Sequence, residues 1–397
     1  MAAGRAAELG AKVLLLEKMG RVGIKLALTG KGRCNLTNGG DRQSFIENYR
    51  HNGKFLHNVF SRFFNQELVS FFHQKGLPTV EERGKRVFPL SNRAQDVARV
   101  LREYVASCGV RTLLHTPARA VLQENGRVVG VRTDSAIRLA SRVILATGGA
   151  SYSQTGSTGD GYQMAQELGH TLVPIRPALV PLEAEEEYIR DLQGLSLKNV
   201  RATLFSSGRK AGEEFGEMLF THFGISGPIV LTLSGPAVEE FPRGRVELSI
   251  DFKPALTHEQ VNQRLLREFQ AGGRKKILNI LPNLLPQKMV PIFLRRGEVP
   301  PEKKGAEIQA GTRRRMVELL KDWRLTLRRA RPLEEAIVTA GGVSVKEIHP
   351  STMESRIVRG LHFCGEVMDI DGKTGGYNLQ AAFSTGWAAG EAAAKVR

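Results

Sequence analysis

The chain has 397 residues, too many for one compact core, so two or more domains are predicted. Hydrophobic residues make up 41% and charged residues 24%, which excludes a wholly disordered chain. Lysine and arginine exceed aspartate and glutamate by 17, an unusually basic balance. No run approaches the roughly 20 apolar residues of a membrane-spanning helix, and the N-terminus lacks the zones of a secretory signal.

The three cysteines, Cys34, Cys108 and Cys364, lie far apart and form no CxxC pair. A structural zinc site or a disulfide framework is therefore not expected, and this cysteine usage is typical of a reducing compartment. We expect a cytoplasmic protein without a metal and without a membrane span. The composition leaves the oligomeric state open.

The net charge of +17 is compatible with two kinds of partner. A nucleic-acid-associated protein would use such charge to contact phosphates, whereas an enzyme could use it to bind an anionic cofactor. Basic residues cluster between Arg295 and Arg331, but aromatic residues do not alternate with them as in single-strand binders. We expect a small-molecule substrate and no specific nucleic acid, with the basic nucleic-acid-associated protein as the non-enzyme alternative.

The N-terminal region is predicted to be the second half of a βαβ unit. An alanine-rich helix over residues 1–9 ends at Gly10, and a short apolar strand follows over residues 12–17. The strand and glycine turn that begin such a unit would precede Met1, so we expect the chain to start inside the motif. Glu17 stands where dinucleotide-binding folds place an acid for the ribose hydroxyls, although alone it could be a surface carboxylate.

The next part, up to residue 180, continues the α/β pattern. Helices are predicted near 55–75 and 94–108, and a hairpin over 112–131 turns at Asn125-Gly126. A buried strand over 143–146 precedes a helix that ends at Gly169. Thr158 or Asp160 could cap that helix.

The pattern changes near residue 181 and returns near residue 336. Strands are predicted at 200–206, 229–233 and 246–252, and helices at 257–281 and 311–323. Strands at 337–339 and 361–364 and a helix over 381–395 then complete the first pattern. We predict a Rossmann-like α/β domain formed by residues 1–180 and 336–397, with an inserted domain over 181–335.

Several glycine-rich turns can approach a flat or anionic ligand closely. The loop from Gly30 to Asn35 offers flexible backbone, a cation and an amide. Its Arg33 could pair with phosphate or with the negative charge of a reduced flavin, or the loop could be a plain tight turn. Cys34 could be a low-pKa thiol beside Arg33 or simply a small packing residue.

Three further turns follow in order along the chain. Thr147-Gly148-Gly149 and Gly365-Glu366 each follow a buried strand, at the sheet edge where open α/β folds bind ligands. Gly375-Gly376 leads into the last helix, whose N-terminal N–H groups favour an electron-rich partner such as a flavin pyrimidine. Each turn alone could be a tight connection, but three in order indicate a binding site.

Longer motifs resemble a known family, the BaiN/RdsA-type flavoproteins, also called NAD(P)/FAD-dependent oxidoreductases or aminoacetone oxidase family FAD-binding enzymes. The resemblance runs essentially from residue 1 to residue 397. The motifs that carry it are TGKGRCNLTN at 29–38, TGSTGDG at 155–161, LFTHFGISGP at 219–228, TAGGV at 339–343, GE at 365–366 and TGGYNLQ at 374–380.

The resemblance implies an FAD-binding Rossmann-like domain interrupted by a β-barrel-like domain with a helical subdomain. Glu17 would bind the adenosine ribose, Ala118 would contact adenine through its main chain, and Asn378 and Leu379 would present backbone to the flavin pyrimidine. The expected FAD contacts are Glu17, Lys18, Gly30, Lys31, Gly32, Arg33, Cys34, Asn35, Ala118, Thr147, Gly148, Gly149, Asp160, Gly365, Glu366, Gly376, Asn378 and Leu379. Family members begin with a strand and a GxGxxG turn that this sequence lacks, so we expect weak or absent FAD retention.

The resemblance implies an NAD(P)H-driven reduction of an organic acceptor such as an enone, since a branch of the family reduces bile-acid enones. No second dinucleotide fingerprint is present, so the nicotinamide would dock directly over the flavin. Tyr377 and His222 are the candidate proton donors, although a histidine such as His222 is more often a hydrogen-bonded structural residue.

Two other enzyme classes compete with this interpretation. One is an oxidase that acts on a small amine or alcohol with oxygen as acceptor. The other is a dicarboxylate enzyme of the fumarate reductase kind, which is disfavoured because Thr339-Ala340 and residues 176–179 offer no histidine.

Overall fold

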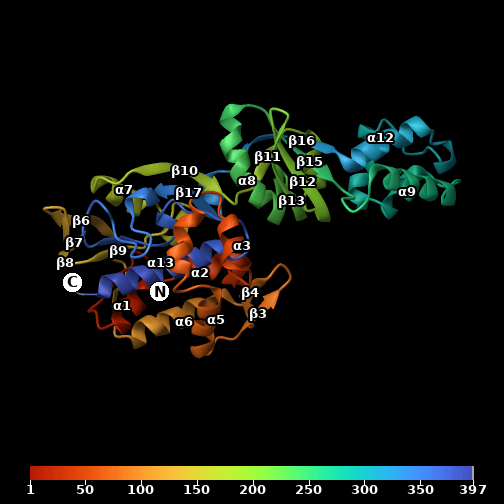
Figure 1. Cartoon of the computed structure of the whole chain (residues 1–397). Helices are drawn as coiled ribbons and strands as arrows, with labels where there is room; N and C mark the ends of the chain where they lie inside the picture. The colour runs from red at the N-terminus through yellow and green to blue at the C-terminus, as the bar shows by residue number, and fades with distance from the viewer. Residues whose placement is uncertain (396–397) are drawn as a thin grey trace. The chain divides into compact units, whose positions relative to one another are not determined.

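The computed structural model describes residues 1–395, which form two compact units. The first unit joins Met1–Arg176 to the C-terminal part from Leu333 onward, and the second comprises Pro177–Pro332. Figure 1 shows the helices and strands of both units, many of them labelled. Among the described residues, no helix is long and apolar enough to cross a membrane.

Two short parallel strand pairs form the α/β part of the first unit. Strand β1 (Leu14–Leu16) pairs with β5 (Arg111–Leu113), and β9 (Val143–Leu145) pairs with β18 (Leu361–Phe363). The two pairs share no strand within residues 1–395. Strands β1 and β9 consist of aliphatic residues only, as expected for parallel strands covered by helices, and β5 and β18 each contain a leucine.

Antiparallel strands complete the first unit. They form a three-stranded sheet of β6, β7 and β8, a second one of β2, β4 and β3, and the pair β10–β17. Their bounds are β2 Thr37–Asn38, β3 Thr79–Glu82, β4 Arg86–Pro89, β6 Ala118–Glu124, β7 Arg127–Thr133, β8 Ile137–Leu139, β10 Leu172–Ala178 and β17 Val338–Val343.

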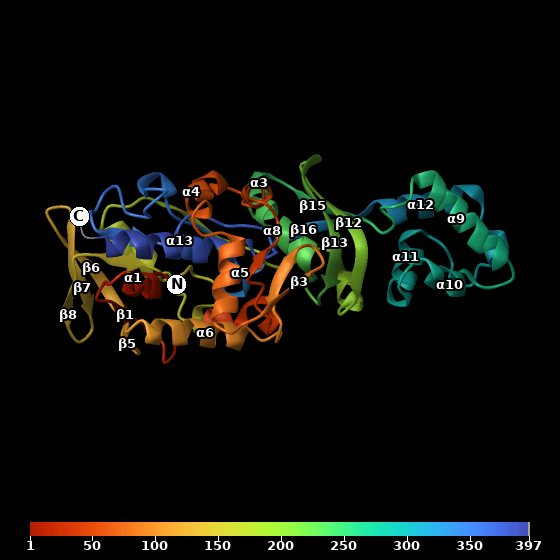
Figure 2. The ribbon, with the colours of Figure 1, turned by 60° about the horizontal axis from the view of Figure 1, so that its bottom comes forward.

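The long C-terminal helix α13 (Tyr377–Ala394) is the central helix of the first unit. It packs against α1 (Ala2–Glu8) and β18, and Figure 2 shows α1 alongside it. Its small residues allow this close approach. The other helices of the unit are α2 Ile24–Leu28, α3 Arg42–Glu47, α4 His57–Phe60, α5 Asn65–Gln74, α6 Ala94–Ser107 and α7 Asp160–Glu167.

The second unit is built on a closed six-stranded barrel in the order β11-β14-β13-β12-β15-β16. The strands are β11 Leu182–Ala184, β12 Ser196–Ser206, β13 Arg209–Phe220, β14 Gly224–Ser226, β15 Val246–Asp251 and β16 Trp323–Ala330. Helix α8 (Pro228–Glu240) packs on β13. A helical subdomain between β15 and β16 comprises α9 His258–Ala271, α10 Ile277–Ile280, α11 Val290–Arg296 and α12 Ala310–Lys321.

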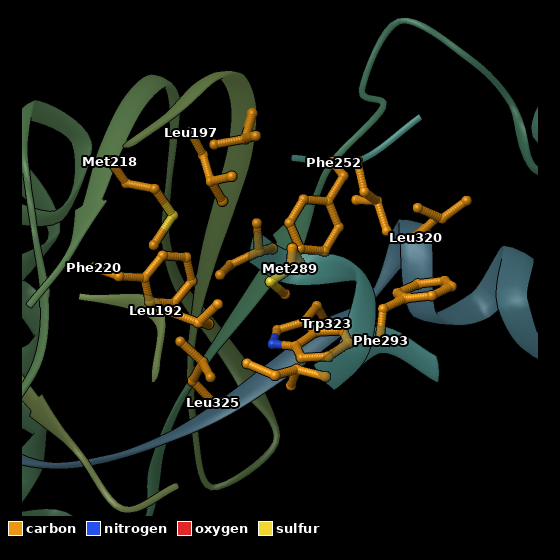
Figure 3. Packing of buried hydrophobic residues seen from close by; sticks show 14 of the residues in the cluster. Leu192, Leu197, Met218, Phe220, Phe252, Met289, Phe293, Leu320, Trp323 and Leu325 are labelled. Carbon is orange, nitrogen blue, oxygen red and sulfur yellow. The ribbon is translucent and has the colours of Figure 1, made fainter. Parts of the chain in front are cut away.

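One apolar cluster fills both the barrel and the helical subdomain. Trp323 is fully buried, its ring stacked on Phe293 with centroids 6.1 Å apart and edge-on to Phe252 at 6.0 Å. Figure 3 shows these rings beside Met218 and Phe220 of the barrel. The cluster runs from Leu182 to Leu327, so barrel and helices share a single core.

The predicted fold class is confirmed, but some predicted elements are wrong. Residues 229–233, predicted as a strand, lie inside α8. The β-branched residues there suggested a strand, but Pro228 occupies a favourable first helical position and the buried residues recur at helical spacing. The helix predicted near 55–75 is two helices, because α5 starts anew where the Glu67 side chain accepts from the Phe64 N–H at 3.0 Å.

Candidate cofactor site

The end of β1 carries two of the predicted contacts, Glu17 and Lys18. Glu17 continues the sheet through its N–H, 2.9 Å from the Leu113 carbonyl, and its carboxylate accepts from the Met19 N–H at 2.8 Å. Lys18 Nζ donates to Asp160 Oδ2 at 2.6 Å and to the Thr158 hydroxyl. Strand β1 and the start of α7 therefore meet through a half-exposed ion pair.

The ion pair with Lys18 favours the ionised form of Asp160. Burial raises its pKa, but hydrogen bonds from Lys18 and Thr158 lower the pKa overall. The capping role suggested for Thr158 or Asp160 is wrong, because the N-cap of α7 is Gly159 and neither side chain caps the helix. Both side chains are engaged with Lys18 or with each other instead.

The start of β6, where Ala118 lies, is close to the same cluster. Arg119 pairs with Asp134 at 2.7 Å, and its positive charge also lowers the Asp160 pKa. The structure thus brings Ala118 and Asp160 to one end of the first unit, although they come from different elements.

A second polar cluster surrounds Glu366. Its carboxylate accepts from Lys25 Nζ at 2.8 Å and from the Thr339 N–H at 2.8 Å, and Lys25 also donates to Ser151 Oγ at 2.9 Å. Gly149 lies against this cluster, since a Cβ there would stand 2.8 Å from Glu366 Oε1. Sequence reasoning missed Lys25, because it stands in an apolar stretch and its partner is 341 residues away.

Of the seven buried polar side-chain atoms without a hydrogen-bond partner within residues 1–395, two lie in loops that the sequence assigned to cofactor binding. They are Oγ1 of Thr147, in the turn that follows β9 with Gly148, and Oδ1 of Asn35. A buried polar atom without a partner is destabilising and rare in folded proteins. Both atoms belong to loops that the sequence assigned to cofactor binding, so a ligand that hydrogen-bonds there would remove both penalties.

The Gly30–Asn35 loop differs from its predicted chemistry in two respects. The Arg33 guanidinium pairs with Glu82, donates to Asn92 Oδ1 at 2.8 Å and lies 4.2 Å from the Phe88 ring centroid, so it already has an anionic partner. Cys34 is fully buried, and burial raises the pKa of its thiol to about 12. The low-pKa thiol interpretation is wrong, and Cys34 is a packing residue.

The neighbouring residues of this loop leave room around the backbone. Gly30 and Lys31 both have φ near +57°, at 58° and 56°, so the chain turns back sharply there. No atom lies within 4 Å of the position that a Cβ on Gly32 would occupy. The loop can therefore be approached closely from that side.

The N-terminus of α13 is open. Gly376 precedes it with φ 99°, and no side chain caps the first turn. The Asn378 side chain accepts from the Gly372 N–H and donates to its carbonyl, both at 2.8 Å, which fixes the preceding loop. The N–H groups of Asn378 and Leu379 therefore remain available, together with the positive end of an 18-residue helix.

The two proton-donor candidates lie in different units. Tyr377 begins α13, its ring edge-on to Phe45 at 4.8 Å, and its carbonyl accepts from the Tyr49 hydroxyl at 2.7 Å. His222 lies in the loop between β13 and β14 of the second unit, exposed and edge-on to Phe223 at 4.9 Å. The first ring is held in place by its neighbours, and the second stands at the surface of its unit.

The donor set of the first unit fits an elongated, anionic, aromatic dinucleotide. It combines two lysines held by carboxylates, two unsatisfied polar atoms, glycine turns and an uncapped helix N-terminus. A profile of the HI0933-like protein Rossmann domain matches residues 1–392. The chain belongs to this family of FAD-dependent oxidoreductases.

The family resemblance inferred from the motifs is thus confirmed, as is the identification of an enzyme. The chain is 32% identical over 388 residues to the 3-dehydro-bile acid delta(4,6)-reductase of Clostridium scindens, which covers 97% of this chain and 93% of that protein. It is 30% identical over 393 residues to the ribosomal RNA dihydrouridine synthase of Haemophilus influenzae, with coverages of 97% and 93%. The Escherichia coli protein of that name is 28% identical over 395 residues, with coverages of 96% and 92%.

Among solved structures, the fold is similar to a 3-ketosteroid delta1-dehydrogenase from Sterolibacterium denitrificans, in complex with 1,4-androstadiene-3,17-dione. The TM-score is 0.49 at 13% identity, with 99% of this chain and 96% of that chain covered.

Proposed function

We propose that the chain catalyses the FAD-dependent reduction of a carbon–carbon double bond conjugated to a carbonyl, with NAD(P)H as reductant. The observation that carries the proposal is the full-length similarity to two differently named reductases. A 3-dehydro, delta-4,6 steroid is a conjugated enone, and dihydrouridine is uridine whose ring double bond next to a carbonyl has been reduced. Both names therefore describe the same bond type, and reducing it is the chemistry we assign to this chain.

We assign the cofactor to the polar clusters of the first unit. When bound, FAD would supply the hydride-transfer chemistry that links a nicotinamide to the double bond. Glu17 would accept hydrogen bonds from ribose hydroxyls. Lys18 and Lys25, which pair with Asp160 and Glu366, would bind phosphate oxygens by exchanging these partners. The open turn at Asn378 and Leu379 would place helix N–H groups and the positive helix end against the electron-rich end of the ring system.

Reduction of a conjugated double bond also requires a proton at the carbon next to the carbonyl. Tyr377 is our first candidate, because it stands at the first helical position of α13, beside the turn that we assign to the flavin. Its ring is fixed by Phe45 and Tyr49, so the hydroxyl is held in one place. His222 is the second candidate, on the barrel unit.

A second candidate substrate is a uracil base in RNA. The net charge of +17 favours it, as do the two relatives named for ribosomal RNA. The reaction is the same reduction, so the two substrates differ only in how they are recognised. An oxidase acting on amines or alcohols is the competing reaction.

The test is stopped-flow kinetics on the full chain in the presence of excess FAD. We expect NADPH or NADH to bleach the flavin absorbance anaerobically, and a 3-oxo-delta-4 steroid or a uracil-containing ribosomal RNA to restore it faster than air does. Peroxide formation from an amine or alcohol, without reoxidation by either alkene, would contradict the proposal. Flavin titration by ultrafiltration in the same experiment measures how tightly the chain holds FAD.

A further inference from the structure

Two short basic stretches of the helical subdomain are far apart in sequence but adjacent in the structure. Arg274, Lys275 and Lys276 follow α9, and Lys303 and Lys304 follow α11. Lys276 and Lys304 form an antiparallel β-bridge, with the Ile277 N–H 2.8 Å from the Lys303 carbonyl and the Gly305 N–H 3.1 Å from the Lys275 carbonyl. We call these five cations the basic bridge.

The charges of the basic bridge are not neutralised within the chain. None of its five side chains forms an ion pair with an acid of the described residues, although Glu302 and Glu307 are close in sequence. The Glu307 carboxylate accepts from the backbone N–H of Lys304 at 2.9 Å. Like charges on facing strands repel, so this arrangement is unfavourable without a partner.

Other cations of the same subdomain do have partners. Arg264 pairs with Glu268 at 2.7 Å, and Arg315 with Glu298 at 2.8 Å. The subdomain therefore neutralises some of its arginines and leaves the basic bridge free. A surface of this kind fits a polyanion.

The bridge is also rigid. Phe269, Ile277 and Ile280 around it are almost fully buried in the core of the unit, at 3%, 0% and 3% exposure. Backbone hydrogen bonds join its two strands, so the backbone positions that carry the cations keep a fixed spacing. A preorganised surface loses little entropy on binding.

We propose that the basic bridge binds the phosphate backbone of structured RNA. Residues 270–284 and 298–310, which include the basic bridge, contain no aromatic side chain on which an unpaired base could stack, which favours backbone contacts to a duplex over single-strand binding. A lipid surface fits less well, because among described residues 257–321 the one large apolar side chain that is well exposed is Leu278, at 37%. RNA binding at the bridge does not depend on which double bond the enzyme reduces.

The test compares two triple variants of the full chain by fluorescence anisotropy with a labelled RNA hairpin. The bridge variant carries Lys275→Gln, Lys276→Gln and Lys304→Gln. The matched control carries Lys12→Gln, Lys54→Gln and Lys346→Gln, which removes the same charge from exposed lysines of the first unit. Thermal unfolding of both variants checks that they fold like the wild type.

We expect the bridge variant to bind the hairpin about 10-fold more weakly near physiological salt. The slope of log K against log salt should fall by about 2 to 3, the value expected for three lost phosphate contacts. The control should bind within about 2-fold of wild type. Flavin reduction by NADPH, measured separately, should be the same in all three proteins, so a failed reductase assay and a failed RNA assay are distinguishable.

Three results would overturn the inference. They are the absence of salt-dependent RNA binding by the wild type, equal weakening in both triple variants, and a bridge variant that loses binding to phosphatidylserine vesicles but not to RNA. Equal weakening would mean that net charge alone attracts RNA.

Discussion

The two units of the chain use their interiors differently. In the first unit, ion pairs such as Lys25–Glu366 and unsatisfied atoms such as Thr147 Oγ1 lie between loops of several small sheets. In the second, the strands close into a barrel and one apolar cluster around Trp323 fills the interior. Polar contacts between loops distinguish the first interior, whereas apolar side chains dominate the second, where Trp323 Nε1 also lacks a hydrogen-bond partner among residues 1–395.

This difference predicts that ligand binding affects the stability of the two units differently. A ligand that binds only the folded form raises the free energy of unfolding of the part that holds it. We therefore expect FAD to stabilise the first unit and to leave the second unchanged.

The largest effect is expected from Trp323→Ala. The side chain is fully buried among Phe252, Phe293 and Tyr188, so its loss should lower the free energy of unfolding of the second unit by about 3–5 kcal/mol. Chemical denaturation followed by circular dichroism measures this. Phe215→Ala, at a side chain 55% exposed, is the control and should change little. An equal loss in the first unit would show that the two cores are coupled.

Tyr377→Phe should lower reoxidation of reduced flavin by the alkene about 100-fold, because the proton donor is lost while the ring packing stays. Reduction by NADPH should be unchanged, and so should thermal stability. Stopped-flow measurement of both half-reactions checks this. Slowing of both to the same extent would indicate that Tyr377 positions the flavin.

Lys25→Met removes the cation that holds Glu366 at 2.8 Å, with both side chains mostly buried. We expect the dissociation constant of FAD to rise about 10-fold, since a charge-assisted hydrogen bond is worth about 1.5 kcal/mol or more. Lys12→Met, at an exposed lysine, is the matched control. Unchanged FAD affinity in the first variant, measured by flavin fluorescence, would remove Lys25 from the site.

The smallest effect is a pH dependence that differs between the units. Burial lowers the pKa of His170 and of His362 in the first unit, so the unfolded chain binds more protons in acid. Their contribution to stability is complete above about pH 6.5 and is lost as the pH falls through the folded pKa. Asp369 acts in the opposite direction, because burial raises its pKa and protonation favours the folded form.

In the second unit, the titratable group that we compare with these histidines is Glu183. Burial raises its pKa, but Arg329 and Arg331 lower it overall, so its contribution is lost only as the pH falls below its unfolded value of about 4.5. Between pH 7 and 5 we therefore expect the free energy of unfolding of the first unit to fall and that of the second to stay nearly constant. Trp387 reports on the first unit and Trp323 on the second, so Trp323→Phe and Trp387→Phe variants give separate fluorescence signals. A parallel decline of both signals would contradict the contrast.

The sequence predicted what depends on local chemistry. Glycine turns after short aliphatic strands indicated the Rossmann-like class, and Asn125-Gly126 marked the turn between β6 and β7. Helix α8 was not predicted, because its isoleucine and valine residues favour strands. It packs with one side against β13, and this long-range contact is not visible in the local sequence.

The contacts of the candidate site depended on long-range pairing and could not be predicted. Lys25 and Glu366 are 341 residues apart, and nothing near Lys25 marks a partner. Arg33 was assigned to an anionic ligand on its charge alone, but the hairpin of β3 and β4 brings Glu82 to it. The assignments of Glu17, Asp160 and the α13 turn to FAD stay predictions until a flavin is measured on this chain.

The shared core of the second unit has a consequence for evolution and for engineering. Residues of α9 to α12 and of the barrel strands pack in one cluster, so deleting the helices would open the barrel to water at Trp323 and Phe252. The helical subdomain is therefore not a detachable module. A protein that dispensed with it would need new apolar side chains to close that end of the barrel.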